Sequence, residues 1–348
     1  MSIAIITGSS GLIGSEAVSL FCKKGFDVIG LDNDFRKVFF GVGSSTISIK
    51  NHLKKKFKNY KHIHLDIRNN SGLNKIFKRY KKNIHIIIHS AAQPSHDYAK
   101  NFPMLDFDIN ARSTLNLLEL TKRYCFDTPF IFMSTNKVYG DLPNYLNFSE
   151  NKTRFDLKKK DKNFNGIDEN FSIDKSTHSL FGVSKCYADL IVQEYGKNLG
   201  LKTVAFRAGC ISGPNHKGAK LHGFLSYLVK SCLKFKSYEI IGYKGKQVRD
   251  NLHSNDLARC FWEFFKKPRF GEIYNIGGGR FSNCSVLEAI NLCSKSIGQE
   301  IKIKIKNKNR TGDHKWYISN TNKFKKHYPD WKQKYSIKEI IEEIIINS

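Results

Sequence analysis

Short apolar runs alternate with longer amphipathic stretches over the first 135 residues of the chain. Five of these runs predict buried strands, at residues 3–7, 27–32, 62–66, 84–90 and 129–135. The runs are apolar on both faces and helical patterns separate them, which is typical of a parallel sheet covered by helices on both sides. The pattern therefore predicts an α/β fold with a doubly wound parallel sheet of the Rossmann type.

The rest of the chain completes this sheet and then forms a smaller lobe. The alternation continues with two helices and one strand, over residues 108–124, 178–199 and 202–209. Residues 141–178 are polar and lack clear periodicity, and so long a connection is more typical of a functional loop than of a plain connector. We therefore predict a first domain over 1–212, which includes this insertion, and a C-terminal α/β lobe over 213–348, with some elements interleaved.

The composition is that of a folded protein in a reducing compartment. The 348 residues are 40% hydrophobic, and no apolar run approaches the roughly 20 residues that cross a bilayer. The first residues lack the basic start and the cleavage site of a signal peptide. Eight cysteines are scattered without a C-x-x-C pair, which favours free thiols over a disulfide framework or a zinc site. We therefore expect a cytoplasmic protein with neither a membrane nor a metal partner.

The net charge of +27 raises the question of an anionic partner. Lysine is spread along the chain, and no basic motif interleaved with aromatic residues is present. Net charge affects solubility and the steering of ligands but does not determine the fold. We therefore do not expect nucleic acid as a partner, whereas a phosphorylated small molecule would benefit from the positive field.

A glycine triplet directly follows the first predicted strand, in the stretch TGSSGLIGS. Gly8, Gly11 and Gly14 stand where a strand turns tightly into a helix, whose free N–H groups and positive dipole end suit a pyrophosphate. Asp32 ends the next strand, roughly 20 residues further on, where a carboxylate binds the adenosine ribose. Because an acid there disfavours a 2′-phosphate, NAD is the predicted cofactor, and only the nearby Arg36 favours NADP.

Further motifs, in the same order, resemble the extended short-chain dehydrogenase/reductase superfamily. They are HLDIRN at 64–69, HSAAQPSH at 89–96, the helix around Asn110 with Ser113 in place of a glycine, MSTNKVYGD at 133–141, Arg207 and Gly213-Pro214. The resemblance covers nearly the whole chain and implies that Thr135 takes the place of the catalytic Ser/Thr. It also implies a set of dinucleotide contacts, from Gly8, Ser10, Gly11, Leu12, Ile13, Gly14, Asp32, Asn33, Arg36, Asp66, Ile67, Ala91, Ala92, Gln93, Asn110 and Lys185.

The second half of the sequence resembles the nucleotide-sugar members of this superfamily. Arg249 in GKQVRD and Arg310 in NRTGDH match arginines that clamp a diphosphate, and Asp313 follows the second of them. The related sugar dehydratases carry Asp-Glu where this chain has Asn136-Lys137, which argues against an elimination reaction.

These motifs, with GIDEN at 166–170, resemble the CDP-paratose 2-epimerase family. The resemblance implies an epimerase that binds NAD tightly, oxidises the C2 hydroxyl of a CDP-sugar to a ketone and returns hydride to the opposite face. It also implies a homodimer formed through the helices at 108–124 and 178–199. The substrate would contact six residues, namely Asn136, Lys137, Phe181, Arg249, Arg310 and Asp313.

One catalytic group of the superfamily is missing. A Tyr-x-x-x-Lys motif supplies the hydroxyl that handles the substrate's proton, and in this chain it reads Phe181-x-x-x-Lys185. Lys185 still suits the nicotinamide ribose, but another group with a pKa not far from 7 must accept the proton. The sequence leaves four groups open for this role, singly or as a relay: Thr135, His96, His178 and Cys210.

Two classes of function fit these residues. The first is an NAD-dependent nucleotide-sugar epimerase, an isomerase of carbohydrate biosynthesis with a rearranged proton path. The second is a catalytically altered relative that senses a dinucleotide or binds RNA, or a different nucleotide-sugar oxidoreductase such as a 4-epimerase. Retention of Thr135, Lys185, Arg249 and Arg310 favours the epimerase, because a pure sensor has no need of a diphosphate clamp.

Overall fold

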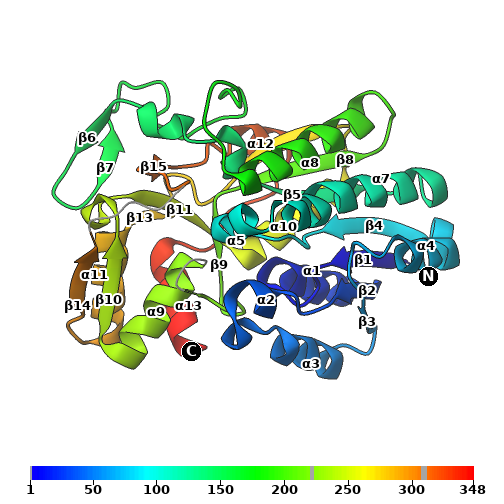
Figure 1. Ribbon diagram of the computed structural model, residues 1–348, viewed down its shortest axis with the longest axis horizontal. Coiled ribbons are helices and arrows are strands. Elements are labelled where there is room, and N and C mark those ends of the chain that lie inside the picture. Colours follow the sequence, from blue (N-terminus) through cyan, green and yellow to red (C-terminus); the bar gives the residue numbers. More distant parts are fainter. Residues whose placement is uncertain (1, 220–222, 307–311) are drawn as a thin grey trace. The chain divides into compact units, whose positions relative to one another are not determined.

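The computed structural model describes residues 2–219, 223–306 and 312–348. Their contacts divide the chain into two compact units, and each is described by itself (Figure 1). Unit 1 consists of Met1–Val138, Leu180–Arg207 and Leu257–Tyr274, and unit 2 of Tyr139–Ser179, Ala208–Asp256 and Asn275–Ser348. No helix in the described part of the chain is both long enough and apolar enough to span a membrane.

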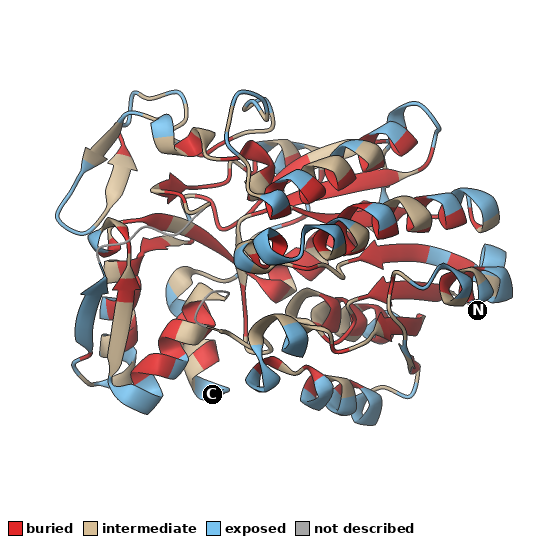
Figure 2. Cartoon of the chain, viewed as in Figure 1, coloured by how far each residue is buried: buried red, intermediate tan, exposed pale blue. Residues whose placement is uncertain are grey.

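Unit 1 is built on a seven-stranded sheet with the order β12-β8-β5-β4-β1-β2-β3. Its strands are β1 (Ile3–Thr7), β2 (Asp27–Asp32), β3 (Tyr60–His64), β4 (Ile84–His89), β5 (Phe130–Thr135), β8 (Thr203–Ala208) and β12 (Glu272–Ile276). The neighbours from β3 to β5 pair in parallel. The predicted doubly wound parallel sheet is therefore confirmed. Its inner strands are mostly buried, as their apolar runs require, whereas the edge strand β3 is partly exposed (Figure 2).

Helices cover both faces of this sheet. On one face, α4 (Asn70–Tyr80), α7 (Ser113–Tyr124) and α8 (Leu180–Lys197) contact one another. Right-handed crossovers place α1 (Leu12–Lys23) and α3 (Ile47–Lys56) on the other face. There the ring of Phe21 packs edge-on against Trp262 of α10 (Ser254–Lys266), with 5.7 Å between the ring centroids. Shorter helices connect these elements, namely α2 (Arg36–Phe40), α5 (His96–Asn101) and α6 (Pro103–Phe107), with a π-helical turn at Asp108–Arg112.

A buried ion pair ties α8 to two strands of the sheet. The guanidinium of Arg207 on β8 donates to both carboxylate oxygens of Asp189, at 3.1 and 2.8 Å. The hydroxyl of Ser134 on β5 donates to the same carboxylate at 2.5 Å. Both charged side chains are almost fully buried, and such a pair makes the core intolerant of losing one partner. The carboxylate therefore fixes the position of α8 beside the end of β5.

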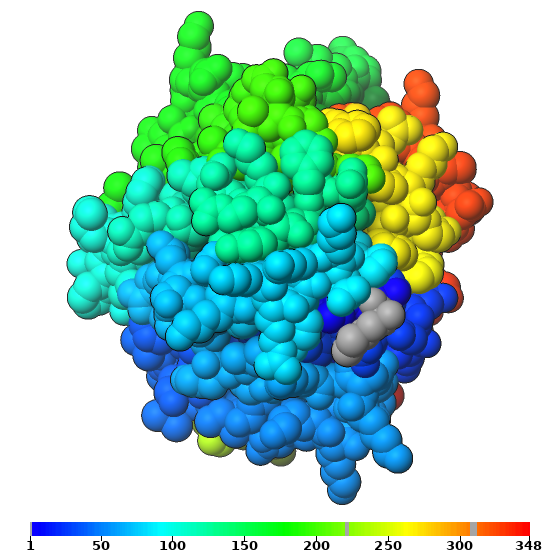
Figure 3. Space-filling model, turned by 90° about the vertical axis from the view of Figure 1, so that its right-hand side faces the viewer, coloured from blue at the N-terminus to red at the C-terminus, as the bar shows by residue number. Residues whose placement is uncertain are grey.

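One group of exposed cations in unit 1 lies at the end of the sheet where β4 begins. Lys78, Arg79, Lys81 and Lys82 close α4 and are all exposed, and β4 starts directly after them. Figure 3 looks onto a face of the molecule on which the chain around these residues lies in lighter blue. This basic surface lies at the amino end of β4, so it is on the opposite edge of the sheet from the carboxyl ends of the strands.

Unit 2 has two small sheets packed with helices. β11 (Val248–His253) pairs with β9 (Cys210–Ser212), β13 (Asn283–Ser285) and β15 (Trp316–Tyr317), and β10 (Ser237–Ile241) pairs with β14 (Lys302–Lys306). A separate apolar core joins α9 (Phe224–Phe235), α11 (Val286–Ile297) and α13 (Ile337–Ile346). A short hairpin of β6 (Phe148–Glu150) and β7 (Phe155–Leu157), with α12 (Asn322–His327), completes the unit.

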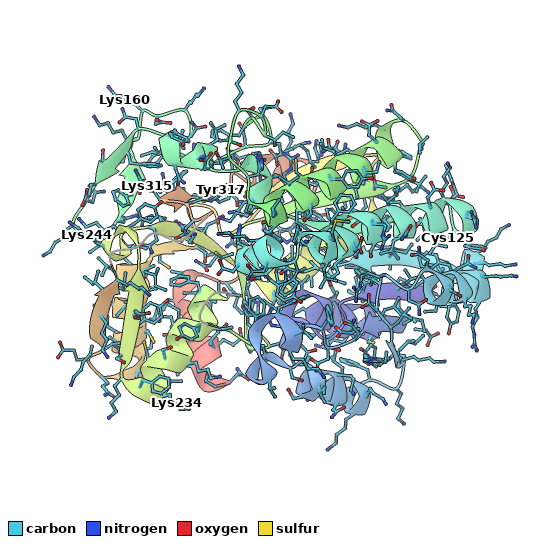
Figure 4. The ribbon with its side chains drawn as sticks, in the orientation of Figure 1. Cys125, Lys160, Lys234, Lys244, Lys315 and Tyr317 are labelled. Carbon is cyan, nitrogen blue, oxygen red and sulfur yellow. The ribbon has the colours of Figure 1, made fainter. Side chains whose placement is uncertain are left out.

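The division of the chain differs from the predicted boundary in three places. Residues 139–179 and 208–212 were expected within the first domain but belong to unit 2, and Leu257–Tyr274 returns to unit 1. The physical reason is long-range bonding: Arg280 holds both oxygens of Asp156 at 2.9 Å and donates to the carbonyl of Phe164 at 2.6 Å. The ring of Tyr317, labelled in Figure 4, stacks on Tyr139 with 6.4 Å between centroids.

Candidate functional site

The predicted dinucleotide residues gather at the carboxyl edge of the sheet in unit 1. β1 lies between β2 and β4, so the chain turns outward in opposite directions from this point. In open α/β sheets such a switch point forms a crevice outside the carboxyl ends of the strands, where ligands bind. The loops after β1, β2, β3, β4 and β5 therefore all meet at one edge.

The glycine loop leaves a cradle between β1 and α1. Gly8 has a positive φ of 66°, and a Cβ there would lie 2.8 Å from the amide nitrogen of Ala91. A Cβ on Gly14 would lie 2.1 Å from the carbonyl oxygen of Gly8, so the helix and strand touch only because no side chain intervenes. A Cβ on Gly11 would meet only the oxygen of Gly8, at 3.3 Å. The packing of the chain therefore restricts position 11 less than positions 8 and 14, and a bound group that approaches the backbone there would be a further reason for glycine.

The first turn of α1 fits an anion in this cradle. Helix α1 starts at Leu12 with no side-chain cap and no acidic residue in its first turn. Its unpaired amide groups and its dipole therefore favour a negatively charged ligand. A pyrophosphate would thus accept hydrogen bonds from the backbone N–H groups that no capping side chain accepts. The residues present therefore fit a dinucleotide.

Asp32 is held rigidly at the end of β2. Its carboxylate accepts the amide of Ser10 at 3.0 Å and the amide of Asp34 at 2.8 Å. Burial raises the pKa of Asp32 above its ordinary value, and the two amide donors oppose this rise. A fixed carboxylate beside the glycine loop is the hydrogen-bond acceptor to which the two hydroxyls of a ribose diol can donate.

The remaining predicted adenosine residues lie on the neighbouring loops. Asp66 accepts two bonds from Arg68, at 3.0 and 2.6 Å, and one from Asn33 at 3.0 Å. Burial opposes ionisation of Asp66, but these bonds hold its pKa below the ordinary value. The guanidinium of Arg36 lies 4.8 Å from the ring centroid of Phe40, and burial lowers its pKa to about 10. Ile67, next to Asp66, is buried.

Lys185 is buried behind the end of β5. Its Nζ donates to the carbonyl of Met133 at 2.6 Å and lies 4.1 Å from the ring centroid of Phe132. Burial lowers the pKa of Lys185 to about 7, although Asp189 and Asp106 act in the opposite direction. Burial thus opposes the charged form of this lysine.

The β5 end carries the predicted catalytic threonine with two substrate candidates. The hydroxyl of Thr135 accepts the amide of Lys137 at 3.2 Å and faces the side-chain oxygen of Asn136 at 3.4 Å. Thr135 and Lys137 are half-buried, and Asn136 is buried. No carboxylate takes part in this turn, so it lacks the acid pair that an elimination would need.

A network of amides joins the loop after β4 to α8. Gln93 donates to Asp106 at 2.7 Å, and Asn110 donates to the same carboxylate oxygen at 2.9 Å. The side chain of Asn110 also pairs with both backbone groups of Gln93, each at 3.0 Å, and reaches Ser184 on α8 at 3.2 Å. The sequence analysis missed Asp106. Its spacing of four residues from Asn110 places both on one helix face, but this local signal does not show that Gln93 meets them there.

The ring of Phe181, the residue without the expected hydroxyl, packs against a histidine. Phe181 is buried, and its ring meets that of His96 edge-on with 5.0 Å between centroids. His96 begins α5 and is half-buried, and Ser95 caps this helix by accepting the amide of Tyr98 at 3.2 Å. Unit 1 thus brings together Thr135, Lys185, Phe181 and His96.

The other predicted residues belong to unit 2. Arg249 donates to the carbonyl of Val248 at 2.7 Å and forms an ion pair with Asp313. His178 lies 3.2 Å from the carbonyl of Ser176, and Cys210 is opposite Asn251 in the pairing of β9 with β11. Arg310, the second predicted clamp residue, lies outside the described residues.

Comparison with known proteins places these features in a family. The sequence model of the NAD dependent epimerase/dehydratase family matches residues 4–277. The chain is 31% identical to CDP-paratose 2-epimerase of Salmonella typhi, across 98% of this chain and 97% of that protein. It is 28% identical to a putative UDP-glucose 4-epimerase of Methanocaldococcus jannaschii, across 84% and 82%.

Solved structures share the fold. UDP-glucose 4-epimerase of Bifidobacterium longum in complex with NAD+ and UDP aligns with a TM-score of 0.79 at 23% identity, covering 99% of this chain and 97% of that one. dTDP-glucose 4,6-dehydratase of Bacillus anthracis aligns with a TM-score of 0.74 at 22% identity, covering 100% and 96%.

Two glycine substitutions should separate cofactor binding from folding. We expect Gly11→Ala to fold normally but to retain far less NAD, because its methyl group enters the cradle and not the protein interior. Gly14→Ala should lower the melting temperature, because its methyl group collides with the Gly8 carbonyl. The measurements are thermal unfolding and the dinucleotide content of the purified proteins. Normal NAD retention in Gly11→Ala would contradict the assignment of the cradle.

Lys185 should make stability depend on pH. Its pKa is about 7 in the folded chain against an ordinary 10.5, so the unfolded chain holds one more proton between these values. The free energy of unfolding should therefore rise with pH across this window, by up to ~1.4 kcal/mol per pH unit from this group. Lys185→Met should remove this contribution and should also abolish turnover. Urea denaturation of both proteins from pH 7 to 10 checks the slope, and equal slopes would show that the lysine is solvated.

Proposed function

The chain belongs to the NAD dependent epimerase/dehydratase family, and on this basis we propose that it inverts the C2 centre of the sugar in a CDP-sugar. It is an NAD-dependent enzyme, as its sequence predicted. The observation that carries the finer proposal is the likeness to CDP-paratose 2-epimerase along practically the full length of both proteins. The turn Thr135-Asn136-Lys137 supports it, because epimerisation needs no carboxylate pair there.

NAD would be held at the carboxyl edge of unit 1. The amides at the start of α1 and the cradle at Gly11 would bind the pyrophosphate, and Asp32 would bind the adenosine ribose. The adenine would lie by Asp66 and Ile67, and the nicotinamide half by Ala91, Ala92 and Gln93. When bound, the dinucleotide takes a hydride from the sugar carbon and later returns it. The chain's own residues hold the sugar and move the proton.

The nucleotide diphosphate would bind to unit 2. Arg249 is a half-buried guanidinium that forms an ion pair with Asp313, and guanidinium groups bind phosphate oxygens in a bidentate way. We propose that Arg249 and Arg310 share the diphosphate. We also propose that Asn136, Lys137 and Phe181 contact the sugar.

The proton of the sugar hydroxyl must pass to a group of the protein. Lys185 would hold the nicotinamide ribose, and Thr135 would bind the reacting hydroxyl. His96, His178 and Cys210 are the remaining acid–base candidates. General acid–base groups typically contribute roughly 10²–10⁴-fold to the rate, so a chain that lacks the tyrosine needs one of them.

We further propose that the enzyme is a homodimer formed through α7 and α8. Leu180, Val183, Tyr187 and Leu190 are spaced at three, seven and ten residues from the first, so they form one stripe on α8. Three of them are large exposed apolar residues, and the ring of Phe107 extends the stripe at 5.7 Å from Tyr187. An apolar stripe of this kind, on α8 with Phe107 at the end of α6, suits a second copy related by a two-fold axis.

Incubation with CDP-sugars tests the proposed function. We expect the purified protein to interconvert CDP-paratose and its C2 epimer, followed by NMR, with no net change in NADH absorbance. Arg249→Ala should weaken CDP-sugar binding by roughly 10- to 100-fold, as the loss of charged hydrogen bonds predicts, and should leave NAD content unchanged. Arg79→Ala, an exposed change on α4, is the matched control. A protein that binds NAD but neither binds nor turns over any CDP-sugar would instead be a dinucleotide sensor.

The apolar stripe predicts the oligomeric state. We expect the double substitution Val183→Glu and Leu190→Glu to produce a folded monomer, because it would place four carboxylates in the two-fold interface. Leu199→Glu changes an equally exposed leucine just beyond the end of α8 and should leave the dimer intact. Light scattering with size exclusion measures both, and a wild-type monomer would refute the dimer.

A further inference from the structure

Three buried ionisable groups of unit 1 can be excluded as the acceptor of the sugar's proton. Asp106 is occupied by two amide donors, and Asp189 by Arg207. Both ring nitrogens of His89 are engaged, by Thr7 at 2.8 Å and Thr114 at 3.0 Å, and burial lowers the pKa of His89 to about 3. None of these groups is suited to exchange a proton with a sugar.

His96 differs from them in its position. Its ring stands edge-on to Phe181 at a centroid distance of 5.0 Å, so it is beside the ring that would carry the usual hydroxyl. Lys185 lies one helical turn beyond Phe181 on the same helix. Imidazole is the side chain whose ordinary pKa is nearest to neutral, which a proton carrier at cellular pH requires.

The loop that carries His96 is fixed to α8 by the amide network. Gln93 accepts the amide of Ser95 at 2.5 Å and donates to its carbonyl at 2.9 Å, so the three residues before His96 have one conformation. Asn110 bonds both Gln93 and Ser184, and Ser184 stands between Phe181 and Lys185 on α8. The distance between His96 and α8 is thus held by buried hydrogen bonds, which is the rigidity that an acid–base group needs.

We propose that His96 replaces the missing tyrosine and carries the proton of the sugar hydroxyl. This inference rests on the proposed function. Bound NAD would supply the two-electron acceptor for the sugar carbon; the O–H bond would then break, its proton would move to a ring nitrogen of His96, and the C=O bond would form. In the return step the same proton goes back to the oxygen and the hydride to the opposite face of the carbon, so protons and electrons balance over one turnover. Gln93, Asp106 and Asn110 are positioning residues for this histidine.

A single substitution and a matched control test the role. His96→Gln should lower kcat for CDP-paratose by roughly 10²–10⁴-fold, with unchanged NAD content, CDP affinity and melting temperature. His85→Gln, at an exposed position at the other end of β4, should behave as the wild type. Equal kcat in His96→Gln and the wild type would overturn the inference while leaving the epimerase assignment intact. An inactive wild type would instead refute the proposed function.

A restored hydroxyl provides the sharper test. In the His96→Gln background, Phe181→Tyr should raise kcat by about 10-fold or more. The reason is that this substitution returns a hydroxyl to the position one helical turn from Lys185. In the wild type the same change should have little effect. Failure of the tyrosine to rescue, in a variant that still binds NAD and CDP, would mean that His96 has a structural role.

Chemical modification gives a readout that does not depend on turnover. Diethyl pyrocarbonate should modify His96 in the wild type, as measured by mass spectrometry, and CDP-paratose should slow this reaction several-fold. The modification of His85 in the same sample is the internal control. An unchanged rate at His96 under saturating CDP-paratose would show that the sugar does not reach this histidine, and would overturn the inference.

Discussion

The contact of α1 with β1 is the constraint on which the site depends. The helix approaches the strand so closely that a methyl group on Gly14 would lie 2.1 Å from the carbonyl of Gly8. This approach directs the start of α1 at the carboxyl edge of the sheet and keeps its amides free for a ligand. Asp32 is then held by the amide of Ser10 inside the same loop. Looser packing of α1 against β1 would therefore displace the groups proposed for the pyrophosphate and those proposed for the ribose at the same time.

Two ionisable side chains at the same edge of the sheet are buried, and their desolvation is unfavourable. Burial lowers the pKa of Lys185 to about 7. Its Nζ donates to the carbonyl of Met133 and lies over the ring of Phe132. Asp106 is also buried, and it is compensated by amides without a charged partner in direct contact. Groups of this kind are poor contributors to stability and typical of functional sites. The buried pair of Arg207 and Asp189, by contrast, is fully matched, and it holds the scaffold under them.

The periodicity of the sequence predicted the sheet and the cofactor loop because their signals are local. Strands apolar on both faces, and glycines at three-residue spacing, are visible within one short window. The insertion at 141–178 was not predicted as part of unit 2, because its partners, Arg280 and Trp316, are more than 100 residues away. Asp106 escaped notice for a related reason. Its role comes from Gln93 and Asn110 arriving at one point, and only the fold brings them there.

The contact between His96 and Phe181 explains why a phenylalanine is compatible with the chemistry. A tyrosine works in this position because a neighbouring lysine lowers the pKa of its hydroxyl, and that demands a charged lysine. Here burial lowers the pKa of Lys185 to about 7, so a phenol beside it would gain less than beside a fully charged lysine, and the expected rescue by Phe181→Tyr is only partial. An imidazole needs no such help, because its ordinary pKa is already near neutral. The absence of the hydroxyl and the burial of the lysine therefore belong together in this proposal. The acid–base group lies on the loop after β4 instead of on α8, and Phe181 of α8 provides the apolar contact that orients the imidazole ring.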